Sequence, residues 1–513
     1  MKKLLLILLF FSFYLAATAQ TSVKILDNLP KDEFKIREIA NELYLKQEFD
    51  LAAEVFLKGR KIMNNDQLFN FELLALYRFR KDKEKLIQEY LNTLAKMPEM
   101  LQQAENVFSV LFDNKSDYLQ LQTALYKRIQ KDPQNEAFSK LLTWQYVQQQ
   151  EYEMALRQLI AQDKRVKDDG GILFDYTQLF IANKAYETAV KAYTYLLEKG
   201  KENEYYLPSR FGLIDAKYQL LQTGKNEEKE VAGLAAQYQS VIDEYGKNTR
   251  TLFAIRKLAT LQAQYLNQPQ KAINLLETAL KMPGLPASET GGIKLELGDN
   301  YVLVGKPWDA ILLYGQVTKQ FENQNISNEA QYRTARLSFF QGNFSYAKSQ
   351  ADVLKASTTQ LIANDALNLS LLLSDHLESA ADTLALKMYA EAEFLQFRNQ
   401  LPAAIRKLDS ITVKYPQNSL NDDILMAKSR IAIKNRDFNA AVIQLKQLIA
   451  HPQKDIWTDD AIFTLAGLYE DQLKDTEQAK ILYQKLITDF PGSMFIAEAR
   501  KHFRKLRGDH IES

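Results

Sequence analysis

The 513-residue sequence contains no cysteine. This excludes disulfide bonds, thiolate catalysis and the lipid-attachment cysteine of a bacterial lipoprotein, so packing alone must stabilise an exported form. Glycine and proline are scarce, at 18 and 12 residues, which is typical of a mostly helical chain with short turns. Lys and Arg total 65 against 64 Asp and Glu. This balance attracts no polyanion, and nucleic acid is not expected as a partner.

Motifs that carry chemistry are missing as well. The four histidines, at 376, 451, 502 and 510, form no HExxH and no cluster at metal-ligand spacing. No Rossmann glycine motif, Walker motif or GxSxG is present. Gly170 and Gly171 fit an inter-repeat turn, because the further oxygen ligands of a calcium loop are absent. We therefore expect no catalytic residue, no cofactor and no metal site.

Long apolar runs are absent except at the start of the chain. Lys2 and Lys3 precede an apolar run from Leu4 to Phe11, and small residues at Ala17 and Ala19 follow. This pattern is typical of a Sec-type signal peptide cleaved after Ala19, and the run is too short to favour a membrane span. An uncleaved anchor and a first core helix are the alternatives.

What the chain does contain is a repeat. Equivalent positions in a helical pattern follow one another at intervals of 34 to 35 residues: Ala52, Leu86, Leu121, Ala155 and Ala189. A helix-turn-helix unit of this length cannot bury its apolar face alone, so copies must stack. The small residue lets two helices approach, and an aromatic four positions later, such as Tyr193 or Tyr314, fills the gap beside it. Proline ends the second helix at four positions: Pro98, Pro133, Pro416 and Pro491.

The spacing lengthens to 37 or 38 residues after residue 235 and is interrupted twice. The interval from Ala189 to Ala235 contains the polar stretch from Thr223 to Glu230, which predicts a longer loop. The interval from Ala347 to Ala404 contains an additional apolar helix from Leu361 to Leu377. The predicted segments are a signal peptide at 1–19, about five repeats at 20–203, a junction at 204–248, further repeats at 249–360, a degenerate or extended repeat at 361–417, and C-terminal repeats with a capping helix at 418–513.

Two repeats carry a recognisable residue pattern: Leu297, Gly298, Tyr301, Gly305, Ala310 and Tyr314 in one, and Ile462, Leu465, Ala466, Tyr469, Ala479, Tyr483 and Pro491 in the other. The chain resembles the tetratricopeptide-repeat superfamily, although Lys294 stands where that family prefers Trp. The resemblance implies an all-α fold, a right-handed α-solenoid superhelix of helix-turn-helix repeats. The C-terminal repeats resemble those of bacterial envelope proteins that assemble outer-membrane proteins or organise peptidoglycan-linked complexes.

The resemblance also implies a partner-binding concave face on the first helices. The family's concave positions fall on Leu295, Asp299, Val302, Tyr332, Arg336, Phe339, Tyr389, Glu393, Phe397, Met426, Arg430 and Ile433. In an open groove these side chains would accept an extended peptide or an amphipathic helix, with Arg336 and Arg430 pairing carboxylates. The alternative is that they pack between neighbouring first helices.

We therefore expect a non-catalytic, exported scaffold that binds a protein or peptide in the periplasm, or at the periplasmic face of the outer membrane, of a Gram-negative bacterium. A carbohydrate-active enzyme and a glycan-binding accessory protein are the alternatives; aromatic and carboxylate side chains converging in one pocket would favour them. The basic segment from Arg500 to Arg507 predicts a capping helix, with peripheral contact to an anionic membrane as its alternative. The sequence determines neither the partner nor the oligomeric state.

Overall fold

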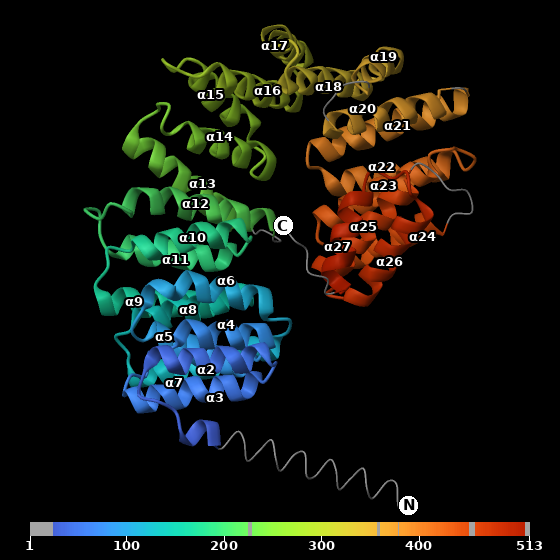
Figure 1. Cartoon of the computed structure of the whole chain (residues 1–513). Coiled ribbons are helices and arrows are strands. Elements are labelled where there is room, and N and C mark those ends of the chain that lie inside the picture. Colours follow the sequence, from blue (N-terminus) through green and yellow to red (C-terminus); the bar gives the residue numbers. More distant parts are fainter. Residues whose placement is uncertain (1–23, 224–227, 356–359, 378, 451–456, 508–513) are drawn as a thin grey trace, which may run out of the picture. The chain divides into compact units, whose positions relative to one another are not determined.

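The computed structural model describes residues 24–223, 228–355, 360–377, 379–450 and 457–507. The expected signal peptide at 1–19 and residues 224–227 of the predicted loop from Thr223 to Glu230 lie outside these ranges, while residues 228–230 belong to helix α13 (Glu228–Tyr245). Every regular element within them is helical (Figure 1). Tertiary contacts divide the chain into two compact units, Met1–Lys217 and Tyr218–Ser513, each of which is described by itself.

The first unit consists of helices that pack as consecutive pairs, with α2 against α3, α4 against α5, α8 against α9 and α10 against α11. Its helices are α2 (Glu33–Leu45), α3 (Phe49–Met63), α4 (Asn70–Arg80), α5 (Lys83–Leu94), η1 (Pro98–Met100), α6 (Leu101–Leu111), α7 (Lys115–Lys131), α8 (Glu136–Gln148), α9 (Tyr152–Val166), α10 (Gly171–Ala182) and α11 (Tyr186–Glu198). The division between the units falls within α12 (Tyr206–Thr223).

The second unit repeats this arrangement, with α14 against α15, α16 against α17, α18 against α19, α21 against α22, α23 against α24 and α25 against α26. Its helices are α13 (Glu228–Tyr245), α14 (Leu252–Thr260), the π-helix η2 (Leu261–Tyr265), α15 (Pro269–Leu280), α16 (Ala287–Leu303), α17 (Pro307–Gln320), α18 (Asn325–Phe340), α19 (Phe344–Leu354), α20 (Gln360–Asp375), α21 (Ala380–Phe397), α22 (Leu401–Lys414), α23 (Asn421–Lys434), α24 (Phe438–Ile449), α25 (Thr458–Asp471), α26 (Thr476–Asp489) and α27 (Ile496–Arg507).

The repeat spacing correctly predicts where helices meet. All twelve equivalent positions are buried and lie on odd-numbered helices up to α19 and then on α22, α24 and α26: Ala52, Leu86, Leu121, Ala155, Ala189, Ala235, Ala272, Ala310, Ala347, Ala404, Ala441 and Ala479. A small or compact side chain suits these positions because most of these helices pack closely on the helix before them; α7 differs, since it packs on α8 and α5. Each unit is therefore an α-solenoid of stacked helical hairpins, and the predicted fold class is confirmed.

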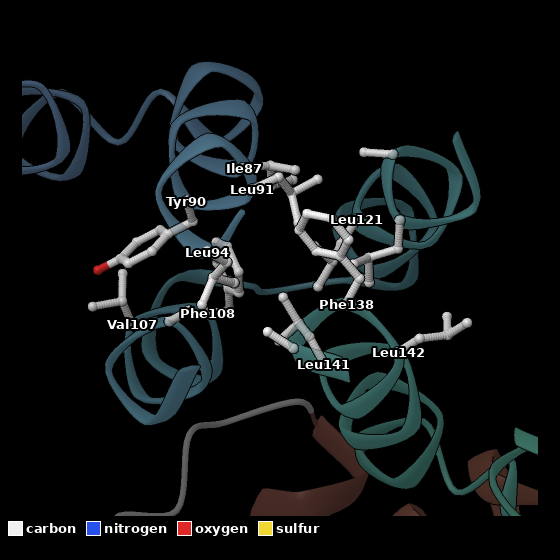
Figure 2. Packing of buried hydrophobic residues seen from close by; sticks show 14 of the residues in the cluster. Ile87, Tyr90, Leu91, Leu94, Val107, Phe108, Leu121, Phe138, Leu141 and Leu142 are labelled. Atoms are coloured by element: carbon white, nitrogen blue, oxygen red, sulfur yellow. The ribbon is translucent and has the colours of Figure 1, made fainter. Parts of the chain in front are cut away.

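The core continues from one pair into the next. Figure 2 shows Leu94 of α5 beside Phe108 of α6, and Leu121 of α7 with Phe138 and Leu141 of α8 in the same packed layer. All five side chains are buried. Because part of the apolar surface of each pair is covered only where neighbouring pairs stack, each repeat depends on the next for its stability.

Proline closely follows the helix end, as predicted, at three of the four positions; α5 instead ends at Leu94, and Pro98 begins η1. The helices α7, α22 and α26 each end two residues before a proline, at Pro133, Pro416 and Pro491. The intervening residues leave the helical region, with φ between −135° and −128° and ψ between 61° and 79°. Steric contact with the proline ring disfavours the helical conformation in the preceding residue.

The additional helix expected between Leu361 and Leu377 is observed as α20, which packs on α19. It precedes the pair α21 and α22, and its presence explains the long interval between Ala347 and Ala404. At the C-terminus, α27 packs on α26 and buries Ala499. No helix in the described ranges combines the length and apolar character that crossing a bilayer requires.

Candidate functional site

The first helices of successive pairs in the second unit form one continuous surface. α16 contacts α18, α18 contacts α21, and α21 contacts α23. All twelve residues predicted to bind a partner lie on these four helices. We call the surface made by α16, α18, α21 and α23 the first-helix face.

Five of the twelve side chains belong to the core, each at most 5% exposed: Leu295, Val302, Phe339, Tyr389 and Met426. Phe339 is completely buried, and its ring centroid lies 5.7 Å from that of Phe344 on α19. These five side chains therefore pack between helices, which is the second of the two alternatives that the sequence left open. Apolar side chains at the line where two helices touch are covered from both sides.

The other seven side chains reach the surface. Arg430 is exposed, and six are partly exposed: Asp299, Tyr332, Arg336, Glu393, Phe397 and Ile433. Their partner-binding role stays a prediction.

A pocket of about 790 Å³ opens beside α18 on this face. Five predicted residues line it: Asp299, Val302, Tyr332, Arg336 and Phe397. The sequence did not identify the rest of the lining, which is Tyr314, Asn325, Glu329, Arg333, Leu337, Phe340, Ile362 and Asp365. Ile362 and Asp365 come from α20, which the regular repeat spacing could not place. The pocket volume falls within the usual range of ligand sites.

Arg333 occupies one wall of the pocket and is fully paired. Its Nε lies 3.1 and 3.2 Å from the two oxygens of Asp299, and its Nη1 lies 2.7 Å from Glu329 Oε1. Burial opposes the positive charge, but the two carboxylates outweigh it and raise the pKa of Arg333. Tyr314 donates to Asp299 Oδ1 at 2.7 Å. The i, i+4 spacing of Glu329 and Arg333 was the one sequence signal for this network.

Arg336 differs from Arg333 because it forms no ion pair with any carboxylate of the described chain. Its guanidinium lies over two aromatic rings, with Cζ 5.2 Å from the Phe340 centroid and 5.5 Å from the Phe397 centroid. The rings attract the cation through their negatively polarised faces. Stacking leaves the N–H groups at the guanidinium edge available to hydrogen-bond acceptors.

Arg430 on α23 repeats this arrangement. Its Cζ lies 4.6 Å from the ring centroid of Trp457, the residue before α25. Within the described ranges, Arg430 forms no ion pair with a carboxylate. Burial raises the pKa of nearby Asp460 to about 6. The charge of Asp459 acts in the same direction, and that of Arg430 acts against it. A guanidinium on an aromatic ring thus occurs twice along the first-helix face.

Asp365 connects the two arginines electrostatically. Burial raises its pKa, while Arg336 and Arg430 both act to lower it. Burial likewise raises the pKa of Tyr332, which both guanidiniums oppose. Groups from α18, α20 and α23 therefore share one electrostatic environment.

This arrangement suits binding better than acid–base chemistry. A glycosidase requires two carboxylates on either side of the scissile bond, yet Asp299 and Glu329 are both engaged by Arg333. Asp365 is the pocket carboxylate that makes no ion pair in the described ranges. Those ranges also contain no group of three or more His, Asp or Glu side chains placed to hold a metal ion.

No protein-family model matches the sequence, and no curated protein matches it. Several solved structures are similar. The structure of Naa15/Naa10 bound to HypK-THB shares 13% identity over 94% of this chain and 84% of that chain, with a TM-score of 0.29. The human IFIT1 dimer with PPP-AAAA shares 16% identity over 77% of this chain and 86% of that chain, with a TM-score of 0.27.

A tetratricopeptide repeat protein from Parabacteroides merdae shares 13% identity over 58% of this chain and 99% of that chain, with a TM-score of 0.24. With TM-scores this low, the α-solenoid assignment rests on the observed helix packing and not on these likenesses.

Proposed function

We propose that this protein is a non-catalytic scaffold that binds protein partners through the first-helix face. The observation that carries the proposal is the pair of arginines, Arg336 and Arg430, which lie on aromatic rings and have no ion-pair partner in the described chain. Partners with acidic segments would supply the missing carboxylates through charge-assisted hydrogen bonds.

The partner segment on this face is an extended peptide or an amphipathic helix. The pocket provides aromatic surface from Tyr332, Phe340 and Phe397 next to the Arg336 guanidinium. Aromatic and arginine side chains are the types that contribute most binding energy at protein interfaces. An apolar anchor in the pocket flanked by acidic residues would satisfy both features.

The cellular setting of this role is the envelope of a Gram-negative bacterium, with export directed by the N-terminal segment. Support comes from the basic and apolar pattern between Lys2 and Ala19 and from the resemblance of the C-terminal repeats to envelope assembly proteins. Mass spectrometry of protein from a periplasmic fraction should give a mature chain that begins at Gln20. A full-length chain confined to the cytoplasmic fraction would contradict export.

Affinity capture tests the binding surface. Tagged mature protein is incubated with envelope extract, and retained chains are identified by mass spectrometry, in parallel with an Arg336→Gln/Arg430→Gln double variant. Arg398→Gln is the matched control, because Arg398 also lies over a ring, that of Phe394, without lining the pocket. We expect partners to be retained by the wild type and the control and lost from the double variant. Equal retention by all three would refute this surface.

A glycan-binding role is the second candidate, because aromatic and carboxylate side chains do converge in one pocket: Tyr332, Phe340, Phe397, Asp299, Glu329 and Asp365. Its test is a panel of soluble polysaccharides assayed for binding and hydrolysis. Binding lost in Tyr332→Ala would favour a glycan accessory protein, and hydrolysis lost in Asp365→Asn would favour an enzyme. If the panel shows neither binding nor hydrolysis, the result supports the scaffold proposal over a glycan-related role.

A further inference from the structure

A second pocket lies within the first unit, at the turn between α9 and α10. Its volume is about 370 Å³. The lining comes from α8, α9, the turn and α10: Glu136, Leu159, Gln162, Asp163, Val166, Lys167, Asp168, Asp169, Ile172 and Leu173. None of these residues belongs to the first-helix face.

Gln162 is the unusual member of this lining. Its side chain is only 4% exposed, yet neither Oε1 nor Nε2 has a hydrogen-bond partner in the described protein. Asp163 Oδ1 and Asp168 Oδ2 are buried without a partner in the same way. A buried polar atom without a partner is costly, so such atoms call for a partner outside the chain, which can be a water, an ion or a ligand. Here three acceptor atoms and one amide donor are concentrated at one pocket.

The surrounding contacts hold these groups in place. The second oxygen of Asp163 accepts from the Tyr195 hydroxyl at 2.6 Å and lies 2.8 Å from Lys199 Nζ. Lys199 also donates to the backbone carbonyl of Asp168 at 2.7 Å, which fixes the turn. Gly170 follows with a φ of +98°, and a side chain there would collide with Leu196. The site is therefore formed before any ligand binds, which lowers the entropic cost of binding.

The charge and shape of the pocket define its ligand. Four carboxylates and one lysine line it: Glu136, Asp163, Asp168, Asp169 and Lys167. Lys140 pairs with Glu136 and Lys199 pairs with Asp163, whereas Asp168 and Asp169 form no ion pair within the described chain. Apolar walls come from buried Leu159 and Leu173 and from exposed Val166 and Ile172. A ligand with several N–H donors on an apolar stem fits both features, and arginine has five donors on a chain of methylenes. The Gln162 amide N–H can donate to the backbone carbonyl of the same ligand residue.

We propose that this pocket binds an arginine side chain of a partner protein. The guanidinium donates to Gln162 Oε1, Asp163 Oδ1 and Asp168 Oδ2, and its methylene stem lies along the apolar walls. This site is independent of the proposed role of the first-helix face, since each pocket lies within a different unit.

Isothermal titration of the mature protein with the blocked tripeptide acetyl-Gly-Arg-Gly-amide tests the assignment. We expect saturable binding, and binding weaker by about tenfold or more for the citrulline peptide, which keeps the shape but loses the charge-assisted hydrogen bonds. The lysine peptide should also bind more weakly, because an ammonium is a compact, strongly hydrated charge without the planar fork of five donors that a guanidinium presents. Absence of saturable binding, or equal binding of the three peptides, would overturn the proposal.

Two variants distinguish a ligand site from a merely hydrated cavity. Asp168→Asn and Gln162→Leu should keep their helical circular dichroism and weaken arginine-peptide binding by about tenfold, because the first removes a negative charge from the acceptor group and the second removes an acceptor. Asp66→Asn, at an exposed position outside the lining, should leave binding unchanged. Retained affinity in Asp168→Asn or Gln162→Leu would show that these atoms do not hold the ligand. The titration does not involve the first-helix face, so its result stands even if the capture experiment recovers no partner.

Discussion

Gly298 of α16 lies directly against the Tyr314 ring of α17, and a Cβ at Gly298 would overlap ring atom Cε1. The close approach of these helices brings the buried Tyr314 hydroxyl to Asp299, which in turn holds Arg333 in the pocket wall. A glycine at a repeat joint therefore determines the geometry of the first-helix face.

Gly298→Ala should destabilise the second unit by about 1–3 kcal/mol, because the added methyl group overpacks the joint. Gly315→Ala is the matched control in the adjoining helix. A Cβ there meets no atom within 4 Å, so alanine should stabilise α17 by up to about 1 kcal/mol. Hydrogen exchange of the α16 and α17 amides gives both values. Equal effects of the two substitutions would contradict the role assigned to the joint.

Phe339→Ala should reduce the free energy of unfolding by about 3–5 kcal/mol, because it empties a fully buried site. Phe397→Ala should instead cost little stability and weaken partner binding by about 1 kcal/mol or more, since Phe397 lines the pocket beneath Arg336. Urea unfolding and a binding assay on the captured partner separate the two effects. A Phe339→Ala variant that keeps its stability but binds the partner more weakly would show that Phe339 contributes to binding and not to the core.

Glu105 on α6 should make the first unit less stable above neutral pH. Burial raises its pKa from 4.5 to about 7. Between these values the folded chain retains a proton that the unfolded chain has released, so the contribution of Glu105 to stability falls as the pH rises through this interval. Glu105→Gln should raise the free energy of unfolding by about 1–2 kcal/mol near pH 8 and change it little near pH 4.

Urea unfolding of the wild type and Glu105→Gln across this pH range measures the difference. Glu99→Gln is the control, because Glu99 is exposed in the neighbouring η1. A difference between the wild type and Glu105→Gln that stays constant with pH would rule out titration of Glu105 as the cause.

Glu89→Gln should destabilise the first unit by about 3–5 kcal/mol, because it leaves the Arg60 charge buried without a counterion. The two side chains are 4% and 7% exposed, and Arg60 Nη1 donates to Glu89 Oε2 at 3.0 Å. Native-state hydrogen exchange at α3 and α5 provides the readout. The double variant Arg60→Met/Glu89→Leu should recover most of the loss.

An exposed ion pair supplies the comparison for Arg60 and Glu89. Lys58 and Asp27 are 37% and 66% exposed, and Asp27→Asn should cost at most about 1 kcal/mol because water screens the pair. A similar cost for Asp27→Asn and Glu89→Gln would mean that burial does not control the strength of these pairs.

Much of the fold followed from local patterns in the sequence. The spacing of Ala52, Ala155, Ala310 and their equivalents located buried positions where the helices of a pair meet, because such a joint requires a compact residue regardless of its neighbours. The apolar run after Leu361 predicted α20 for a similar reason, since a helix of that length needs an apolar side to pack. Arg336 and Arg430 were also selected from their positions in the repeat.

Burial and pairing of individual side chains depended on contacts that no local pattern contains. Phe339 and Phe397 are both aromatic residues of first helices, yet one is in the core and the other lines a pocket. Arg333 and Arg336 are one turn apart, and only Arg333 meets the carboxylate of Asp299 from α16. Repeat spacing is set within each helix pair, whereas exposure and charge pairing are set by side chains that come together only when the pairs stack.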